Sequence, residues 1–116
     1  MKLTLENLAK VGAFTGAPAE RDITWKQGSK ELTCTVFVRP MSYKTAVADI
    51  AAINGSGEPA AARIASCICD EDGVAIFTTE DVTGEADPDR GPLDRNLTMA
   101  LLQAIGEVSG LGKSES

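Results

Sequence analysis

Residues 21–40, RDITWKQGSKELTCTVFVRP, decide the fold because two strand-like patterns meet there across a turn sequence. In the first half, Ile23 and Trp25 alternate with polar residues up to the turn sequence QGSK at residues 27–30. In the second half, apolar residues alternate with threonines: Leu32, Cys34, Val36 and Val38. The stretch therefore predicts a β-hairpin with one apolar face.

Helical patterns are found on both sides of this hairpin. Thr4 is a suitable N-cap for a short helix whose apolar side holds Leu5, Leu8 and Val11. After the hairpin, Ser42 precedes a second helical pattern over residues 43–54, which ends at an Asn-Gly pair. The apolar face of this second helix carries Ala46, Val47, Ile50 and Ala51.

The strongest helical pattern runs from about Leu93 to Val108, with Pro92 in its first turn. Its apolar stripe repeats every three or four residues along one side: Leu93, Leu97, Leu101, Ile105 and Val108. Met99 and Leu102 widen the apolar surface beyond this stripe. We expect the stripe to be covered by the hairpin, with Leu97, Leu101 and Ile105 in the core.

Residues 60–78 allow two interpretations. The alanines at residues 60–62 favour a helix, whereas RIASCIC at residues 63–69, followed by DEDG and VAIFT, favours a second hairpin with Asp72-Gly73 as its turn. We expect the second hairpin and leave open whether residues 60–69 are helix or strand. The fold class is then α+β, with two β-hairpins packed against two or three helices, one of them a long C-terminal helix.

Length and composition limit the function. The 116 residues predict a single domain over residues 1–116, with a short disordered tail at about residues 112–116. A net charge of −6 opposes binding to nucleic acid or to anionic membranes. No apolar run is long enough to cross a bilayer, and the first ten residues, MKLTLENLAK, show no signal-peptide core. These features predict a cytosolic protein.

Catalysis and metal binding have little support in the sequence. Histidine, the commonest general base, is absent, so we expect no enzyme activity and no cofactor. Cys34, Cys67 and Cys69 form no CxxC pair, and we expect them to be small core residues rather than zinc ligands. Eight acidic residues lie between positions 70 and 89: Asp70, Glu71, Asp72, Glu80, Asp81, Glu85, Asp87 and Asp89. They fit a solvated surface better than a calcium site, because Gly73 does not stand where an EF-hand calcium loop needs its glycine.

Three blocks of the chain together resemble the tail assembly chaperones of long-tailed, lambda-like bacteriophages. The blocks are VFVRPMSY, CDEDGVAIFTTEDV and LTMALLQAIGEVSGLGKS, and the resemblance covers roughly residues 32–113. It implies a small, acidic, non-enzymatic protein of the host cytoplasm that keeps the tape measure protein soluble and is absent from the finished virion. It also implies a longer form, made by a −1 ribosomal frameshift, whose extension recruits the tail tube protein.

A chaperone of this kind needs exposed apolar surface for its client. We expect Met99, Leu102 and Val108 to supply it, because they fall beside or at the end of the core stripe. Many copies acting along one long client would also favour weak self-association.

The C-terminal residues Leu111, Gly112 and Lys113 fit the frameshift expectation. The codons CTG GGA AAG would encode them and contain a slippery heptamer, G GGA AAG. We therefore predict that these three residues are encoded by a frameshift site.

Two other classes of protein remain open. The first is a structural tail-tube or head–tail connector subunit of the virion, which would also be small, acidic and α+β. The second is a small enzyme or metal-binding domain that uses Cys67, Cys69 and the nearby carboxylates.

Overall fold

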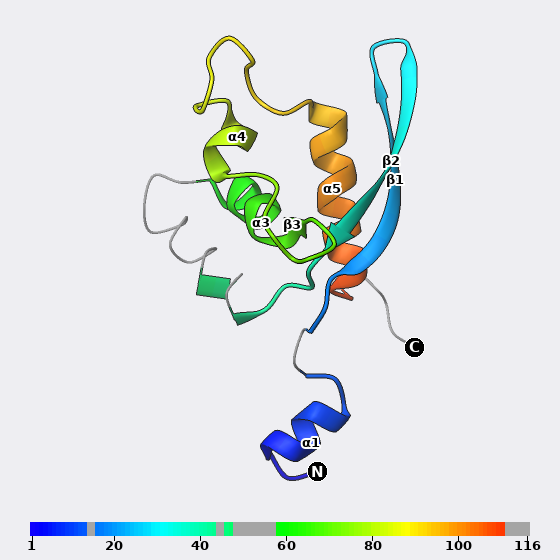
Figure 1. Ribbon diagram of the computed structural model, residues 1–116, viewed down its shortest axis with the longest axis vertical. Helices are drawn as coiled ribbons and strands as arrows, with labels where there is room; N and C mark the ends of the chain where they lie inside the picture. The colour runs from blue at the N-terminus through cyan, green and yellow to red at the C-terminus, as the bar shows by residue number, and fades with distance from the viewer. Residues whose placement is uncertain (14–15, 44–45, 48–57, 111–116) are drawn as a thin grey trace.

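A computed structural model describes residues 1–13, 16–43, 46–47 and 58–110. Within these residues, three antiparallel strands form one sheet in the order β1-β2-β3, and four named helices accompany it (Figure 1). The elements are α1 (Leu5–Lys10), β1 (Ala19–Gln27), β2 (Lys30–Val38), α3 (Pro59–Cys67), β3 (Ile68–Cys69), α4 (Thr79–Thr83) and α5 (Arg95–Val108). The α+β class predicted from the sequence is confirmed.

The predicted first hairpin is also confirmed. Strands β1 and β2 pair over nine residues each, and Gln27 lies opposite Lys30, so Gly28 and Ser29 form a two-residue turn. Gly28 has a φ of +65°, which a glycine adopts without steric strain. On the outer face, hydroxyl contacts join the strands: Thr24 Oγ1 to Thr33 Oγ1 at 3.0 Å, and Thr35 Oγ1 to Asp22 Oδ1 at 2.8 Å.

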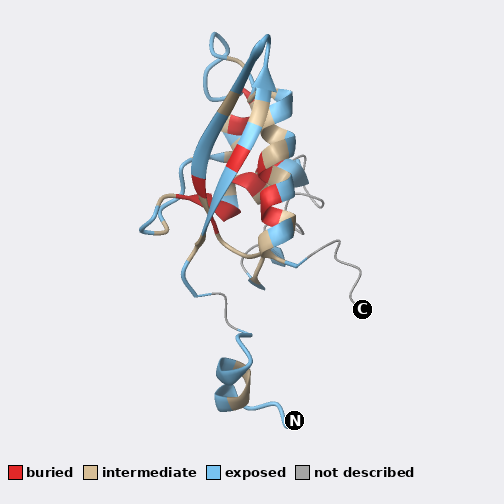
Figure 2. Cartoon of the chain, turned by 90° about the vertical axis from the view of Figure 1, so that its right-hand side faces the viewer, coloured by how far each residue is buried: buried red, intermediate tan, exposed pale blue. Residues whose placement is uncertain are grey.

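The core lies between one face of the sheet and the helices (Figure 2). Ile23, Val36 and Val38 point to this side from the sheet, and they pack against buried residues of α3, β3, α4 and α5. The helical and β3 contributions are Ala61, Ile64, Cys67, Ile68, Val82, Leu101, Ala104 and Ile105. The opposite face of the hairpin is mostly polar and exposed, so the fold has two layers.

The expected second hairpin is wrong for its first strand. Residues Pro59–Cys67 form helix α3 instead, with Pro59 at the start and three buried residues at helical spacing: Ala61, Ile64 and Cys67. Only Ile68–Cys69 is strand, and it pairs with the end of β2. A single bridge from Cys69 to Ala75 and a tight turn at residues 70–74 remain of the predicted hairpin.

Helix α4 was not predicted from the sequence. It begins with a capping box, in which Thr78 Oγ1 accepts from the Asp81 amide (3.1 Å) and Asp81 Oδ2 accepts from the Thr78 amide (2.9 Å). It ends at Gly84, whose φ is +94°. A β-carbon at Gly84 would lie 2.7 Å from the backbone nitrogen of Pro92, so only glycine lets α4 approach the segment that enters α5.

Helix α5 begins two residues later than predicted, because Asp94 is its N-cap. Its side chain accepts a hydrogen bond from the Leu97 amide at 3.0 Å. The side-chain amide of Asn96 donates to the Lys26 carbonyl at 2.8 Å and ties the first turn of α5 to β1. As predicted, Leu101 and Ile105 are fully buried, and Leu97 packs against the core while partly exposed.

Helix α1 forms as predicted, with Thr4 Oγ1 accepting from the Asn7 amide at 3.0 Å. It has no buried residue, and it lies away from the sheet and the other helices (Figures 1 and 2). Of the helix expected over residues 43–54, the structure describes only Tyr43, Ala46 and Val47 as helical. The rest of that prediction, including its Asn-Gly end, falls outside the described residues.

Candidate partner-binding surfaces

Leu102 lies on the side of α5 roughly opposite the residues that line a hollow with β1, and Met99 lies about 60° around the helix from Leu102. Met99 is 54% exposed, and Leu102 is partly buried against the core. Leu102 also lines a hollow of about 200 Å³ between α3 and α5, together with Met41, Pro59, Ala60, Arg63, Ile105 and Gly106. Residues three apart on a helix are neighbours on its surface, so Met99 lies next to Leu102, although it does not itself line this hollow. We call Met41, Pro59, Ala60, Met99 and Leu102 the α5 patch.

Val108, the third residue expected at a partner surface, is placed differently. At about 100° per residue, it lies about 180° around α5 from Met99. It is partly buried and packs against the core. The structure therefore brings Met99 and Leu102 to one surface and leaves Val108 on the other side of the helix. Leu111, Gly112 and Lys113 lie outside the described residues.

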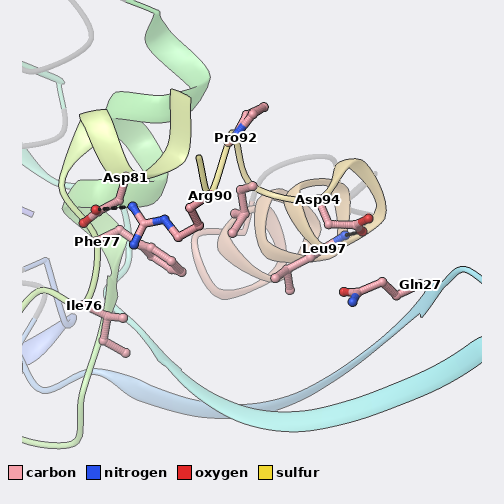
Figure 3. A pocket seen from close by; sticks show the side chains of 10 residues that line it. Gln27, Ile76, Phe77, Asp81, Arg90, Pro92, Asp94 and Leu97 are labelled. Atoms are coloured by element: carbon pink, nitrogen blue, oxygen red, sulfur yellow. Dashed lines mark hydrogen bonds and ion pairs between the residues drawn. The ribbon is translucent and has the colours of Figure 1, made fainter. Parts of the chain in front are cut away.

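A second apolar surface, which the sequence did not indicate, lies between α4, the start of α5 and the tip of the hairpin (Figure 3). This α4–α5 groove has a volume of about 340 Å³. Its apolar lining comes from Ile76, Phe77, Pro92, Leu93 and Leu97, and its polar rim from Gln27, Asp81, Arg90 and Asp94. Ile76 is 55% exposed. The sequence pattern predicts a paired strand over residues 74–78, and a paired strand there would not leave such a groove.

An ion pair closes one side of this groove. Arg90 Nη2 donates to Asp81 Oδ1 at 2.8 Å, with the Arg90 side chain reaching back toward α4 (Figure 3). The hydrogen bond from the Thr78 amide, together with the Arg90 guanidinium and the Thr78 hydroxyl, holds the pKa of the Asp81 carboxyl below its ordinary value. The carboxylate is therefore charged at neutral pH, and it orders both the cap of α4 and the rim of the groove.

The acidic residues between positions 70 and 89 lie at the surface, and several organise the backbone. Asp70 Oδ1 accepts from the amides of Asp72 and Val74 at 2.8 and 2.9 Å, and Asp87 Oδ1 accepts from the Asp89 amide at 3.1 Å. In the part of the chain that the structure describes, no three acidic, cysteine or histidine side chains gather as a metal site.

The cysteines divide into two groups. Cys67 and Cys69 are buried as predicted, and burial raises the pKa of the Cys69 thiol, although nearby Arg39 opposes this shift. The prediction for Cys34 is wrong, because this residue is exposed. Cys34 pairs with Ile23 across the hairpin, but helix α5 packs mainly along β1 and does not cover Cys34 on β2.

The described residues form a small α+β fold with two surface hollows that have apolar linings. A family model described as phage tail assembly chaperone, TAC, matches residues 6–109. The chain belongs to this family of phage tail assembly chaperones, whose members are in general non-enzymatic. Neither a curated protein nor a solved structure gives a significant match. Among the described helices, none has the length and apolar character to cross a bilayer.

Proposed function

We propose that this chaperone binds the tape measure protein through the α5 patch and keeps it soluble during tail assembly. The observation that carries the proposal is the exposure of Met99 beside the hollow lined by Leu102, on a helix whose opposite side is firmly packed. Membership of the tail assembly chaperone family supports a client among the tail proteins.

The chemistry of the α5 patch suits a helical client. An amphipathic helix binds by placing its apolar side chains into a hydrophobic groove. Met41 and Met99 are unbranched and polarisable, so they adapt to client side chains of different shape along a long repetitive chain. The hollow between α3 and α5 accepts one anchoring side chain, and the flexible methionines pack around it.

The acidic surface between residues 70 and 89 supplies the second property of a soluble chaperone. Copies that carry the same strong negative charge repel one another, which opposes aggregation of loaded complexes. Most of these carboxylates are exposed, so their charge acts on the solvent side.

Co-expression with the tape measure gene of the same genome tests the proposal. We expect the tape measure protein to move from the pellet to the soluble fraction, and Met99→Asp to reverse this shift. Val74→Asp is the matched control, because Val74 is 62% exposed and lies outside the α5 patch and the groove. Equal insolubility with and without the chaperone contradicts the proposed function.

We also propose that a minority longer form, made by a −1 frameshift, recruits the tail tube protein. The support is the amino-acid series Leu111-Gly112-Lys113, which the slippery sequence CTG GGA AAG can encode. The gene's nucleotides test this directly, because any codons without the heptamer at Gly112 and Lys113 remove the proposed site.

The chaperone acts in the host cytoplasm and leaves before the tail is complete. A structural tail-tube or connector subunit would remain in the particle instead. Mass spectrometry of purified virions distinguishes the two functions, since the proposed chaperone is absent from them and a tube or connector subunit is present in many copies.

A further inference from the structure

Strand β1 forms an open edge of the sheet, because in the described part of the chain only β2 pairs with it. The two-residue turn makes Gln27 and Lys30 a hydrogen-bonded pair, and in an antiparallel ladder every second residue bonds to the partner strand. Ile23 and Trp25 therefore bond to β2, and the residues on either side of Ile23 turn their N–H and C=O groups outward. Such an open edge is a template for another extended chain.

Side chains close the two ends of this edge. The Asn96 side-chain amide donates to the Lys26 carbonyl at 2.8 Å, and Arg21 Nη1 donates to the Glu20 carbonyl at 2.9 Å. Both carbonyls belong to even-numbered residues, which agrees with the outward direction derived from the turn. Residues 22–24 lie between the two caps, so the edge is open over a short window only.

This window consists of four main-chain groups, the N–H and C=O groups of Asp22 and Thr24, and we call it the β1 window. Among the described residues, none of these four groups has a hydrogen-bond partner. A hollow of about 220 Å³ opens along the window, between β1 and α5. Residues 21–24 all line this hollow, and successive strand side chains point to opposite faces, so the lining they share is the main chain of the edge.

The side chains around the β1 window indicate which residues an added strand carries. Ile23, Ala100 and Ala104 form the apolar part of the hollow, and the two alanines are one turn apart on α5. The central residue of an added strand lies opposite Ile23 and on the same face of the sheet, so an apolar side chain such as valine fits the hollow. The two residues beside it lie on the other face, where Asp22 favours an opposed lysine or arginine.

The charge of the hollow also favours basic residues in the added strand. Two carboxylates line it, Asp22 and Glu107, and each accepts from a neutral side chain: the Thr35 hydroxyl at 2.8 Å and the Gln103 amide at 3.3 Å. The one cation in the lining, Arg21, donates to a main-chain carbonyl. The lining therefore has a surplus of negative charge, which attracts lysine or arginine.

We propose that the β1 window binds an extended segment of a partner protein by strand addition, and that this segment carries an apolar residue between two basic residues. An antiparallel segment satisfies all four groups of the window with two of its residues, and its middle side chain enters the hollow. A helical segment cannot bind in this way, because its main-chain groups bond within the helix. The inference does not rest on the client proposed for the α5 patch.

Binding of a short peptide to the full chain tests the inference. The peptide Thr-Lys-Val-Lys-Thr, acetylated and amidated at its ends, has the proposed pattern in both chain directions. In ¹⁵N NMR spectra, millimolar peptide should shift the amide signals of Asp22 and Thr24 most, and the indole signal of Trp25, the only tryptophan, should move with them. Replacing both peptide lysines by glutamates should abolish these shifts, because like charges then oppose each other at Asp22.

Two methylated peptides give the decisive comparison. In the bound strand, the amides of both lysines point at the β1 window, whereas the valine amide points away from it. Methylating both lysine amides removes two main-chain hydrogen bonds, so it should weaken binding about tenfold or more. Methylating the valine amide instead should leave the affinity nearly unchanged.

Variants of the chain test the same contact from the other side. Thr24→Pro removes one outward N–H, and proline is tolerated at an edge where that N–H faces solvent. Thr24→Ala is the matched control, because both variants lose the contact with Thr33 and only proline removes the edge donor. Thr24→Pro should abolish the peptide-induced shifts, and Thr24→Ala and Met99→Asp should retain them.

A second variant keeps the test independent of the folding of Thr24→Pro, which circular dichroism checks. Ala100→Leu fills the hollow from α5 and leaves the main chain of β1 as it is. It should weaken binding of the valine peptide and leave binding of the same peptide with a central glycine unchanged.

Other results overturn the inference. Unchanged amide signals of Asp22 and Thr24 at millimolar peptide contradict it, and so does equal binding of the two methylated peptides. Shifts centred on Met99 would show that the peptide binds the α5 patch instead. Pairing of two copies through their β1 edges in the absence of peptide would show that the window takes a second copy and not a partner segment.

Discussion

Helices α1 and α5 begin with the same local signals and differ in what covers them. Each has a side-chain cap, Thr4 for α1 and Asp94 for α5, and each carries an apolar series at helical spacing. The series on α5 is buried down to 0% exposure at Ile105, whereas Leu5 on α1 is 75% exposed. Capping and periodicity thus determine that a helix forms, while long-range packing determines whether its apolar side meets the core or a partner.

The largest effect should come from truncating a leucine on each helix. Leu101→Ala leaves a cavity beneath α5, and we expect it to lower the free energy of unfolding by about 2–5 kcal/mol. Leu5→Ala removes a solvated side chain, so the change should stay within about 0.5 kcal/mol. Urea unfolding measures the free energy of unfolding of both variants, in protein dilute enough that copies of the chain do not associate. Equal losses would show that α1 belongs to the core in solution.

The glycines that follow α1 and α4 allow a similar comparison of an exposed and a packed part of the chain. Gly84 and Gly12 both have positive φ, but an added β-carbon would collide with the Pro92 backbone only at Gly84. In Gly84→Ala, backbone strain costs about 1–3 kcal/mol and the collision adds to it. Gly12→Ala is strained as well, because the φ of Gly12 is +76°, but α1 buries no residue, so this strain should weaken α1 and leave the unfolding midpoint of the body unchanged. A similar drop in midpoint for both variants would show that α1 stabilises the body.

Removing the caps should have a smaller effect. Asp94→Ala exposes an unpaired Leu97 amide at the start of α5, which should lower the free energy of unfolding by about 1 kcal/mol. Thr4→Ala removes the equivalent bond in α1, and it should reduce helical circular dichroism without moving the thermal midpoint of the body. A midpoint shift in Thr4→Ala would mean that α1 stabilises the packed part of the chain.

Acid should produce the smallest effect, through Asp81. Its pKa is depressed in the folded protein below the ordinary value of 3.8. The stabilisation that the charged Asp81 carboxylate gives to the folded protein is therefore complete at neutral pH, and it is lost as the pH falls through the folded-state pKa of Asp81. Asp81→Asn should flatten this part of the acid dependence of urea unfolding, whereas Glu6→Gln, at the exposed ion pair of α1, should leave it unchanged. Parallel acid profiles for Asp81→Asn and the unmodified chain would contradict the assignment.

Sequence periodicity was sufficient for the elements with strong local signals. The hairpin followed from alternation and a turn at residues 27–30, and α5 followed from five apolar residues along one side. Its start was misplaced by two residues because Asp94, rather than Pro92, marks the boundary. The capping sequence Thr78-x-x-Asp81 is a signal for the start of α4, but the apolar run just before it, at residues 74–77, favours a strand.

The remaining errors came from tertiary context. In residues 63–69, the apolar residues fit a strand as well as a helix, and the packing of Ala61, Ile64 and Cys67 into the core favours helix α3. Cys34 continues the apolar alternation of β2 but lies beyond the cover of α5. The α4–α5 groove joins side chains from four segments, so no single stretch of sequence indicates it.

The account places the client surface on α5 and leaves helix α1 apart from it, and the three methionines report on both regions. Met99 and Met41 belong to the α5 patch, and Met1 precedes α1. NMR spectra of the chain labelled with ¹³C at its methionine methyl groups test the separation directly. Adding tape measure protein to dilute chaperone should shift the Met99 and Met41 signals and leave Met1 unchanged. A shift of Met1 alone, or no shift at any methionine, would contradict the assignment of the client to the α5 patch.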